Sequence, residues 1–136
     1  MDISSEQIQA RVPVTILRLS GDVDGSNFKT VIQKAVELNR QGARDLVIDL
    51  AGVRYTSSAG LVALHNIARL FNSLEMPDPE NGWRAIRMVG EANKPGIQTH
   101  VKLLSPQPHV AAVLEQTGLN AYFPIFTDQA AAVESF

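Results

Sequence analysis

Apolar positions along the chain first show the spacing of β-strands. Residues 12–19 are rich in β-branched and aliphatic side chains and end at Ser20-Gly21, which predicts a strand that begins near Pro13. Residues 3–9 are expected to pair with this strand as a hairpin. Residues 46–50 form an almost continuous apolar run, the pattern of a central strand that is covered on both faces. Helices must therefore pack against this strand.

Two segments show the spacing of amphipathic helices. From Asn27 the apolar side chains recur every three or four positions, which predicts a helix capped by Ser26 and ending near Gly42. A second helix is expected after residue 58, with His65 and Asn66 off its apolar stripe. The stripe consists of Leu61, Leu64, Ala68 and Phe71.

The last third of the chain alternates short apolar runs with helix signals. Residues 101–104 read as a buried strand, and residues 105–118 as a short helix that begins with proline and ends at a glycine. Residues 122–126 are expected to form another strand. Thr127 or Asp128 can cap a final helix that runs to the end of the sequence. The alternation of strands and helices predicts an α/β fold with a small mixed sheet and helices packed on it.

Composition limits the classes of function. The 136 residues are the size of one domain, expected to span 1–136, and with 45% hydrophobic and 19% charged residues the chain is globular. A net charge of -2 gives no basic field for a nucleic acid or an anionic membrane surface. The chain lacks cysteine, a basic leader and any run of about 18 apolar residues, so we expect a cytoplasmic protein without membrane insertion.

Two adjacent hydroxyl residues, Ser57 and Ser58, lie between a predicted strand and a predicted helix. The ordinary role for a serine there is helix capping. The start of a helix also favours a negative group, and the small residues Ala59 and Gly60 allow another molecule to approach closely. A nucleophile elbow would need glycine two positions before the serine, where Thr56 stands. The pattern therefore does not favour a catalytic serine, and we do not expect an enzyme.

Metal and cofactor sites are not expected. His65, His100 and His109 are far apart in the sequence and lack partners at metal-ligand spacing, so they are expected to lie on the surface or in loops. Neither phosphate-binding glycine signature is present. Residues 21–25 contain two aspartates and would repel a phosphate, which favours a turn.

Three segments, in order, resemble the STAS domain, a family named for sulfate transporters and anti-sigma factor antagonists. Residues 47–61, Val-Ile-Asp-Leu-Ala-Gly-Val-Arg-Tyr-Thr-Ser-Ser-Ala-Gly-Leu, resemble the core of the family. Residues 20–24, Ser-Gly-Asp-Val-Asp, resemble its acidic loop, and residues 101–126 its last strands and third helix. Residues 75–98 fall outside the resemblance as an atypical insertion, in which residues 85–89 could form a short strand.

The resemblance implies an anti-sigma factor antagonist that acts in bacterial transcription regulation by partner switching. Its acceptor serine, carried over by position, is Ser58; many antagonists have aspartate immediately before the acceptor, where this sequence has Ser57. The implied partner is an anti-sigma factor that is also a serine kinase with a histidine-kinase-type ATPase domain, and a phosphatase is a further candidate. The alternative is a phosphorylation-independent STAS interaction module or scaffold, of the stress-signalling or lipid-transport type. The expected partner-binding residues are Asp22, Asp24, Thr56, Ser57, Ser58, Ala59 and Gly60.

Overall fold

Five strands form one mixed sheet in the order β1-β2-β3-β4-β5. The computed structural model describes residues 1–72 and 100–136, so the expected strand at 85–89 and the insertion at 75–98 lie outside the described residues. Strands β1 (Asp2–Gln9) and β2 (Pro13–Ser20) form the predicted antiparallel hairpin. Strand β2 then pairs in parallel with β3 (Leu46–Gly52). The predicted hairpin of two strands and the predicted central strand are confirmed.

The remaining strands extend the sheet in parallel. Strand β4 (Val101–Leu104) pairs with β3, and β5 (Ile125–Phe126) pairs with β4. The expected strand at 122–126 is only partly correct, because Leu119–Tyr122 form a short helix, α5, that begins directly after Gly118. Gly118 has a φ of +81°, a conformation that ends α4 (Pro108–Thr117) without strain and redirects the chain.

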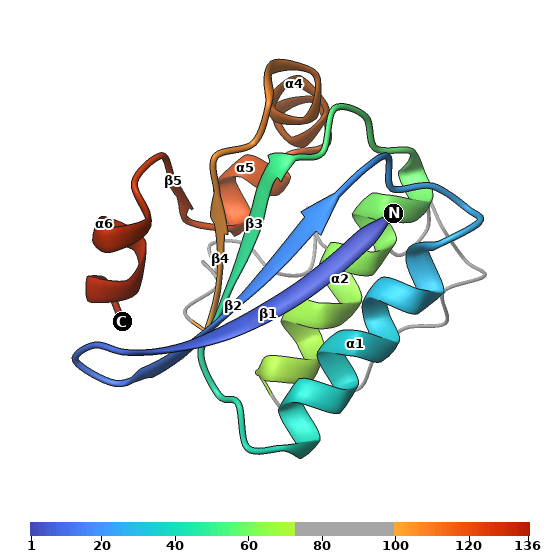
Figure 1. The fold of residues 1–136 in the computed structure, drawn as a ribbon. Helices are drawn as coiled ribbons and strands as arrows, with labels where there is room; N and C mark the ends of the chain where they lie inside the picture. The colour runs from blue at the N-terminus through green and yellow to red at the C-terminus, as the bar shows by residue number, and fades with distance from the viewer. Residues whose placement is uncertain (73–99) are drawn as a thin grey trace.

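Helices cover both faces of this sheet (Figure 1). Helices α1 (Phe28–Arg40) and α2 (Ser58–Phe71) pack side by side on one face, while α6 (Gln129–Glu134) lies against the other. Alternation along the strands explains the division, since neighbouring side chains on a strand point to opposite faces. Leu17 and Leu19 point toward α1 and α2, whereas Val14 and Ile16 point toward α6.

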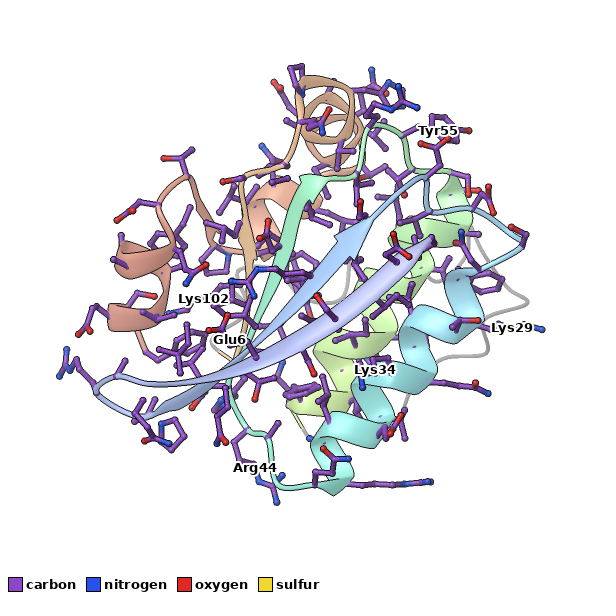
Figure 2. The ribbon with its side chains drawn as sticks, viewed as in Figure 1. Glu6, Lys29, Lys34, Arg44, Tyr55 and Lys102 are labelled. Carbon is purple, nitrogen blue, oxygen red and sulfur yellow. The ribbon has the colours of Figure 1, made fainter. Side chains whose placement is uncertain are left out.

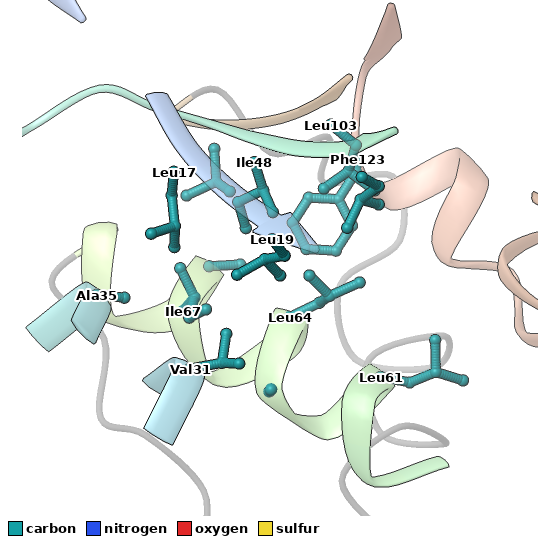
Figure 3. Packing of buried hydrophobic residues seen from close by; sticks show 14 of the residues in the cluster. Leu17, Leu19, Val31, Ala35, Ile48, Leu61, Leu64, Ile67, Leu103 and Phe123 are labelled. Atoms are coloured by element: carbon teal, nitrogen blue, oxygen red, sulfur yellow. The ribbon is translucent and has the colours of Figure 1, made fainter. Parts of the chain in front are cut away.

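The larger core lies between the sheet and the α1–α2 layer (Figure 3). Leu17, Ile48 and Leu103 come from three adjacent strands and are fully buried there. Val31 and Ile67 reach the same core from α1 and α2. This packing fixes the start of α2 at the carboxyl end of the parallel strands, where open α/β sheets place their sites.

The helix caps differ in part from the sequence expectation. Asn27, rather than Ser26, occupies the N-cap position of α1, because the backbone N–H and hydroxyl of Ser26 both bond to the Asp24 carboxylate. At the other end of the chain, Asp128 caps α6 by accepting a hydrogen bond from Ala131 N at 3.0 Å, as predicted.

Candidate functional site

The loop between β3 and α2 is joined to the loop between β2 and α1. Val23 and Thr56 form an isolated parallel bridge, in which Val23 N–H donates to Tyr55 O at 3.1 Å and Ser57 N–H donates to Val23 O at 2.9 Å. The bridge brings the acidic segment at 22–24 beside the start of α2. Segments more than 30 positions apart in the sequence therefore form one surface at the carboxyl end of the sheet.

Gly60 allows these two loops to approach each other closely. A Cβ atom added to Gly60 would lie 2.0 Å from the hydroxyl oxygen of Thr56 and 3.0 Å from a methyl group of Val23. The first of these distances is shorter than any contact between unbonded heavy atoms, so a side chain at this position would push the start of α2 away from the bridge. Gly60 and Thr56 thus position the site, and both are buried.

The two serines have different environments. Ser57 is the N-cap residue of α2, but its hydroxyl makes no capping hydrogen bond; the oxygen is buried and has no partner in the part of the chain that the structure describes. Ser58 is the first residue of α2 and is half-buried. No hydrogen bond joins its hydroxyl to any residue within 1–72 or 100–136. Neither hydroxyl has a partner among the described residues, so burial distinguishes the pair: the Ser57 oxygen is buried, whereas Ser58 is half-buried where the helix begins.

Asp22 and Asp24 also differ. The Asp24 carboxylate accepts hydrogen bonds from the hydroxyl and the backbone N–H of Ser26, and these two bonds, in that order, lower the pKa of Asp24. Asp24 therefore organises the turn before α1. The side chain of Asp22 is exposed; its backbone oxygen accepts a hydrogen bond from the Asn27 amide at 2.9 Å, and its carboxylate has no partner within 1–72 or 100–136.

An exposed aromatic stack borders this surface, and the sequence analysis missed it. The ring of Tyr55 lies 5.2 Å from the ring of His109, with an interplanar angle of 23°, and Tyr55 is 45% exposed. Figure 2 shows Tyr55 at the outer side of the loop that leads to α2. The two residues are 54 positions apart, and no spacing in the sequence signals their contact. Only the position of Tyr55, three residues before Ser58, could have drawn attention to it.

The prediction for the histidines was right for two of the three. His109 is exposed, and His100 is an exposed residue whose Nδ1 lies 3.0 Å from the Asp45 carboxylate. His65 was expected on the surface but is only 2% exposed, and neighbouring Asn66 is fully buried. The correction has a physical cause: α2 is buried around nearly its whole circumference, so positions off the apolar stripe are covered as well.

A small cavity lies close to the serines among the described residues. A cavity of about 10 Å³, lined by apolar side chains with Thr56 and Gly60, lies beneath the bridge. That volume matches about one water molecule. Among residues 1–72 and 100–136 no group of three histidine, aspartate or glutamate side chains is placed to hold a metal ion. Over the same residues, no helix has the length and apolar character needed to cross a membrane.

Comparison with known families adds one match. The family described as "Mlab, STAS domain" matches residues 7–77, which contain β2, α1, β3, α2 and both joined loops. Comparison with curated proteins gives no match.

Solved structures with the same fold cover nearly all of the chain. A candidate anti-sigma factor antagonist from Thermotoga maritima is 19% identical with a TM-score of 0.70, covering 97% of this chain and 92% of its own. An anti-sigma factor antagonist from Mycobacterium paratuberculosis is 20% identical with a TM-score of 0.64 and the same coverage. The Bacillus cell fate determinant SpoIIAA, in its phosphorylated form, is 17% identical with a TM-score of 0.59, covering 96% of both chains. At these identities the likeness concerns the fold.

Proposed function

This chain belongs to the STAS domain family, and from that membership we propose that it is an anti-sigma factor antagonist acting in a partner switch. The unmodified protein binds an anti-sigma factor that is also a serine kinase with a histidine-kinase-type ATPase domain, so that a sigma factor is released. Phosphorylation of Ser58 ends this binding, and a phosphatase restores it. The protein acts in the cytoplasm as a binding partner, and the ATP and its metal belong to the kinase.

The observation that carries the proposal is the position of the Ser58 hydroxyl, unpartnered at the first residue of α2. A kinase can reach such a group, and the N–H groups at the helix start tolerate the negative charge that results. The likeness of the fold to SpoIIAA, which has been solved in a phosphorylated form, supports the assignment. The buried oxygen of Ser57 makes Ser57 a poor acceptor by comparison.

Free energies explain how one phosphate could release a partner without unfolding the domain. A phosphoserine carries about -1.5 to -2 charges at neutral pH. On the free domain, the start of α2 offsets this charge by roughly 0.3–2 kcal/mol. In a closed interface an unpaired charge costs several kcal/mol, whereas a hundredfold loss of affinity needs only about 2.7 kcal/mol. The effect on docking therefore exceeds the effect on folding.

The acidic loop adds to this effect mainly through Asp22. Its exposed carboxylate belongs to the loop that is bridged to the serine loop, so it lies on the surface that a phosphate on Ser58 would join. The carboxylate of Asp24 is engaged by Ser26, and we assign it chiefly to the turn. Thr56 and Gly60 support the surface by keeping the start of α2 close to the bridge, and Ala59 packs against the core beside them.

The test combines phosphorylation with binding. The purified protein is incubated with ATP, magnesium and a co-purifying or gene-neighbour ATPase of the histidine-kinase type, and the product is mapped by mass spectrometry. We expect one phosphate, on Ser58. Ser58→Asp should weaken binding of the kinase by at least about a hundredfold, because it introduces a charge into the interface.

Ser57→Ala is the matched control, since it removes the adjacent hydroxyl. It should still be phosphorylated and should bind the kinase with nearly unchanged affinity. A phosphate on another residue, or unchanged binding by Ser58→Asp, would contradict the proposal.

The second candidate function is a phosphorylation-independent STAS interaction module. One observation favours it: Ser57 stands where antagonists often have aspartate, and its hydroxyl makes no capping bond to the first turn of α2. In that case the protein would bind its partner through the same surface without a switch. A Ser58 that stays unmodified, together with full binding by Ser58→Asp, would select this function.

A further inference from the structure

The outer edge of β1 is open. Strand β1 is the first strand in the sheet order, so one side pairs with β2 and the other side pairs with no strand of the described chain. An edge strand presents a row of unpaired N–H and C=O groups that can pair with another strand. The opposite edge of the sheet is formed by β5, which is only two residues long.

Strand β1 lacks several of the features that usually protect an edge, although it carries the charged residues Asp2 and Glu6. It is eight residues long, and its pairing with β2 runs without a register shift from Asp2 opposite Ser20 to Gln9 opposite Pro13. It contains neither lysine nor proline, the residues that commonly block edge pairing. Six of its eight residues are exposed, the exceptions being Ile3 and Ile8. The edge is therefore long, regular and accessible.

We propose that β1 pairs antiparallel with β1 of a second copy of this chain, with Ser5 opposite Ser5 of that copy. Two copies of one chain form closed dimers most often through a two-fold axis. If that axis is perpendicular to the sheet, each side chain keeps its face, and one residue of β1 must lie opposite itself. The sequence of β1 then decides which residue is at the axis.

Charge selects Ser5 for this position. With Ser5 at the axis, Glu6 faces Ser4 and Asp2 faces Ile8, so no two acidic side chains are opposite each other. Placing Glu6 at the axis would set the two Glu6 side chains opposite each other. Placing Ser4 there would set Asp2 opposite Glu6. Like charges directly across a strand pair are destabilising, so both of these registers are disfavoured.

Two further observations favour this register. A register centred on Gln7 also avoids acidic pairs, but it joins only residues 5–9, whereas the one centred on Ser5 joins residues 2–8. The Glu6 carboxylate is already paired within its own chain, since Arg18 Nη1 lies 2.7 Å from it. Figure 2 shows Glu6 on β1. The central part of the edge can thus approach a second copy without a free acidic group opposing it.

The dimer would leave the serine site open. An axis perpendicular to the sheet points the parallel strands of the two copies in opposite directions, so their two Ser58 sites lie at opposite ends of a continuous sheet. The inference is independent of the switch, because pairing through β1 requires no modification of Ser58.

The absence of cysteine from the chain makes the register testable by disulfide trapping. Directly opposed residues of an antiparallel pair lie about 4.5–5.5 Å apart at Cα, within the range of a disulfide. Under mild oxidation, full-length Ser5→Cys should form a covalent dimer. Ser4→Cys is the matched control: in this register the two substituted residues are offset by two positions, at roughly 8 Å, and should cross-link far less.

Sedimentation of the unmodified chain provides the second measurement. We expect a concentration-dependent increase in mass from 14.8 kDa toward twice that value. Ser5→Lys places two positive charges opposite each other at the axis and should weaken the dimer by at least about tenfold. Circular dichroism of this variant should be unchanged, because Ser5 is exposed. A chain that stays monomeric at all concentrations, or equal cross-linking of the two cysteine variants, would overturn the proposal.

Discussion

At the residue scale, the two adjacent serines show how far a motif can be interpreted from sequence. The pattern of a strand followed by small residues and an apolar stripe was sufficient to place Ser58 at the start of a helix, and the structure agrees. The pattern could not show that Ser57 occupies the cap position without using its hydroxyl as a cap. That outcome depends on the rotamer of Ser57, which packing decides.

His65 is the residue that the sequence analysis placed wrongly. A helix pattern gives only the direction of a side chain, and a polar residue off the apolar stripe is normally assigned to solvent. The ring of His65 instead meets that of Tyr122 in an edge-to-face contact, with centroids 6.3 Å apart. Neither ring nitrogen has a hydrogen-bond partner within the described residues. No local signal in α2 indicates a contact with α5.

The buried imidazole predicts a loss of stability in acid. Burial, with a smaller contribution from the charge of Arg69, lowers the pKa of His65 to about 4. An unfolded chain takes up the proton near pH 6.5, whereas the folded protein does so only near its lower pKa. Between these values the free energy of unfolding should fall with decreasing pH by about 1.4 kcal/mol per unit, roughly 3 kcal/mol in all.

Urea unfolding at a series of pH values measures this dependence. His65→Leu removes the titrating group and retains an apolar side chain, so its stability should vary less between pH 7 and pH 4. His109→Leu is the control, because His109 is exposed and should leave the pH dependence of the unmodified protein in place. Equal slopes for the unmodified protein and His65→Leu would show that His65 does not carry the effect.

At the element scale, helix positions were predicted better than helix ends or short strands. The long periodic segments predicted α1 and α2 correctly, because burial of an apolar stripe contributes most of the stability of such helices. The cap of α1 was missed because Asp24 competes for Ser26. The strand expected at 122–126 is limited to Ile125–Phe126 in the structure. Gly118 ends α4 and allows a further helical turn, α5, before this strand. A run of five apolar residues does not distinguish these outcomes.

The contact between the start of α2 and the bridge predicts a strong effect for Gly60→Ala. Alanine is the better helix former by about 1 kcal/mol, yet its Cβ would collide with Thr56. We expect a net loss of about 1–3 kcal/mol in the free energy of unfolding, the usual range for overpacking. Urea unfolding provides the measurement.

A double-mutant cycle identifies the colliding atom. Thr56→Ala removes the oxygen that would lie 2.0 Å from the new Cβ, while the Thr56 Cβ would remain 3.3 Å away. The double variant Gly60→Ala with Thr56→Ala should therefore be more stable than the sum of the single effects predicts. If the effects of the two single substitutions are additive, the strain in Gly60→Ala does not come from the Thr56 hydroxyl.

At the scale of the whole molecule, the sheet separates two cores with different contents. The buried polar residues on α2 are His65 and Asn66, whereas the α6 side includes Lys102, which is only 7% exposed. Its Nζ donates to Ser135 Oγ at 2.7 Å and lies 4.0 Å from the centre of the Phe136 ring. Desolvation lowers the pKa of Lys102, with an opposing effect from Asp45. The apolar pattern of residues 101–104 predicted β4, but it did not indicate that Ser135 and Phe136 cover Lys102.

The buried stem of Lys102 predicts different effects for two substitutions. Lys102→Met keeps an unbranched apolar side chain on this face, so stability should change by less than about 1.5 kcal/mol. Lys102→Ala removes three methylene groups and should lose about 2 kcal/mol. Urea unfolding of both variants at neutral pH tests this. If methionine proves as destabilising as alanine, the ammonium contacts with Ser135 and Phe136 matter more than the stem.

The bridge between Val23 and Thr56 has a mechanical consequence for the molecule. Two hydrogen bonds hold the segment before α1 against the segment before α2, and the missing side chain of Gly60 allows their close approach. A force on either segment is therefore transmitted to both helices of the same layer. A partner that binds at this end of the sheet would therefore displace α1 and α2 together, as one unit.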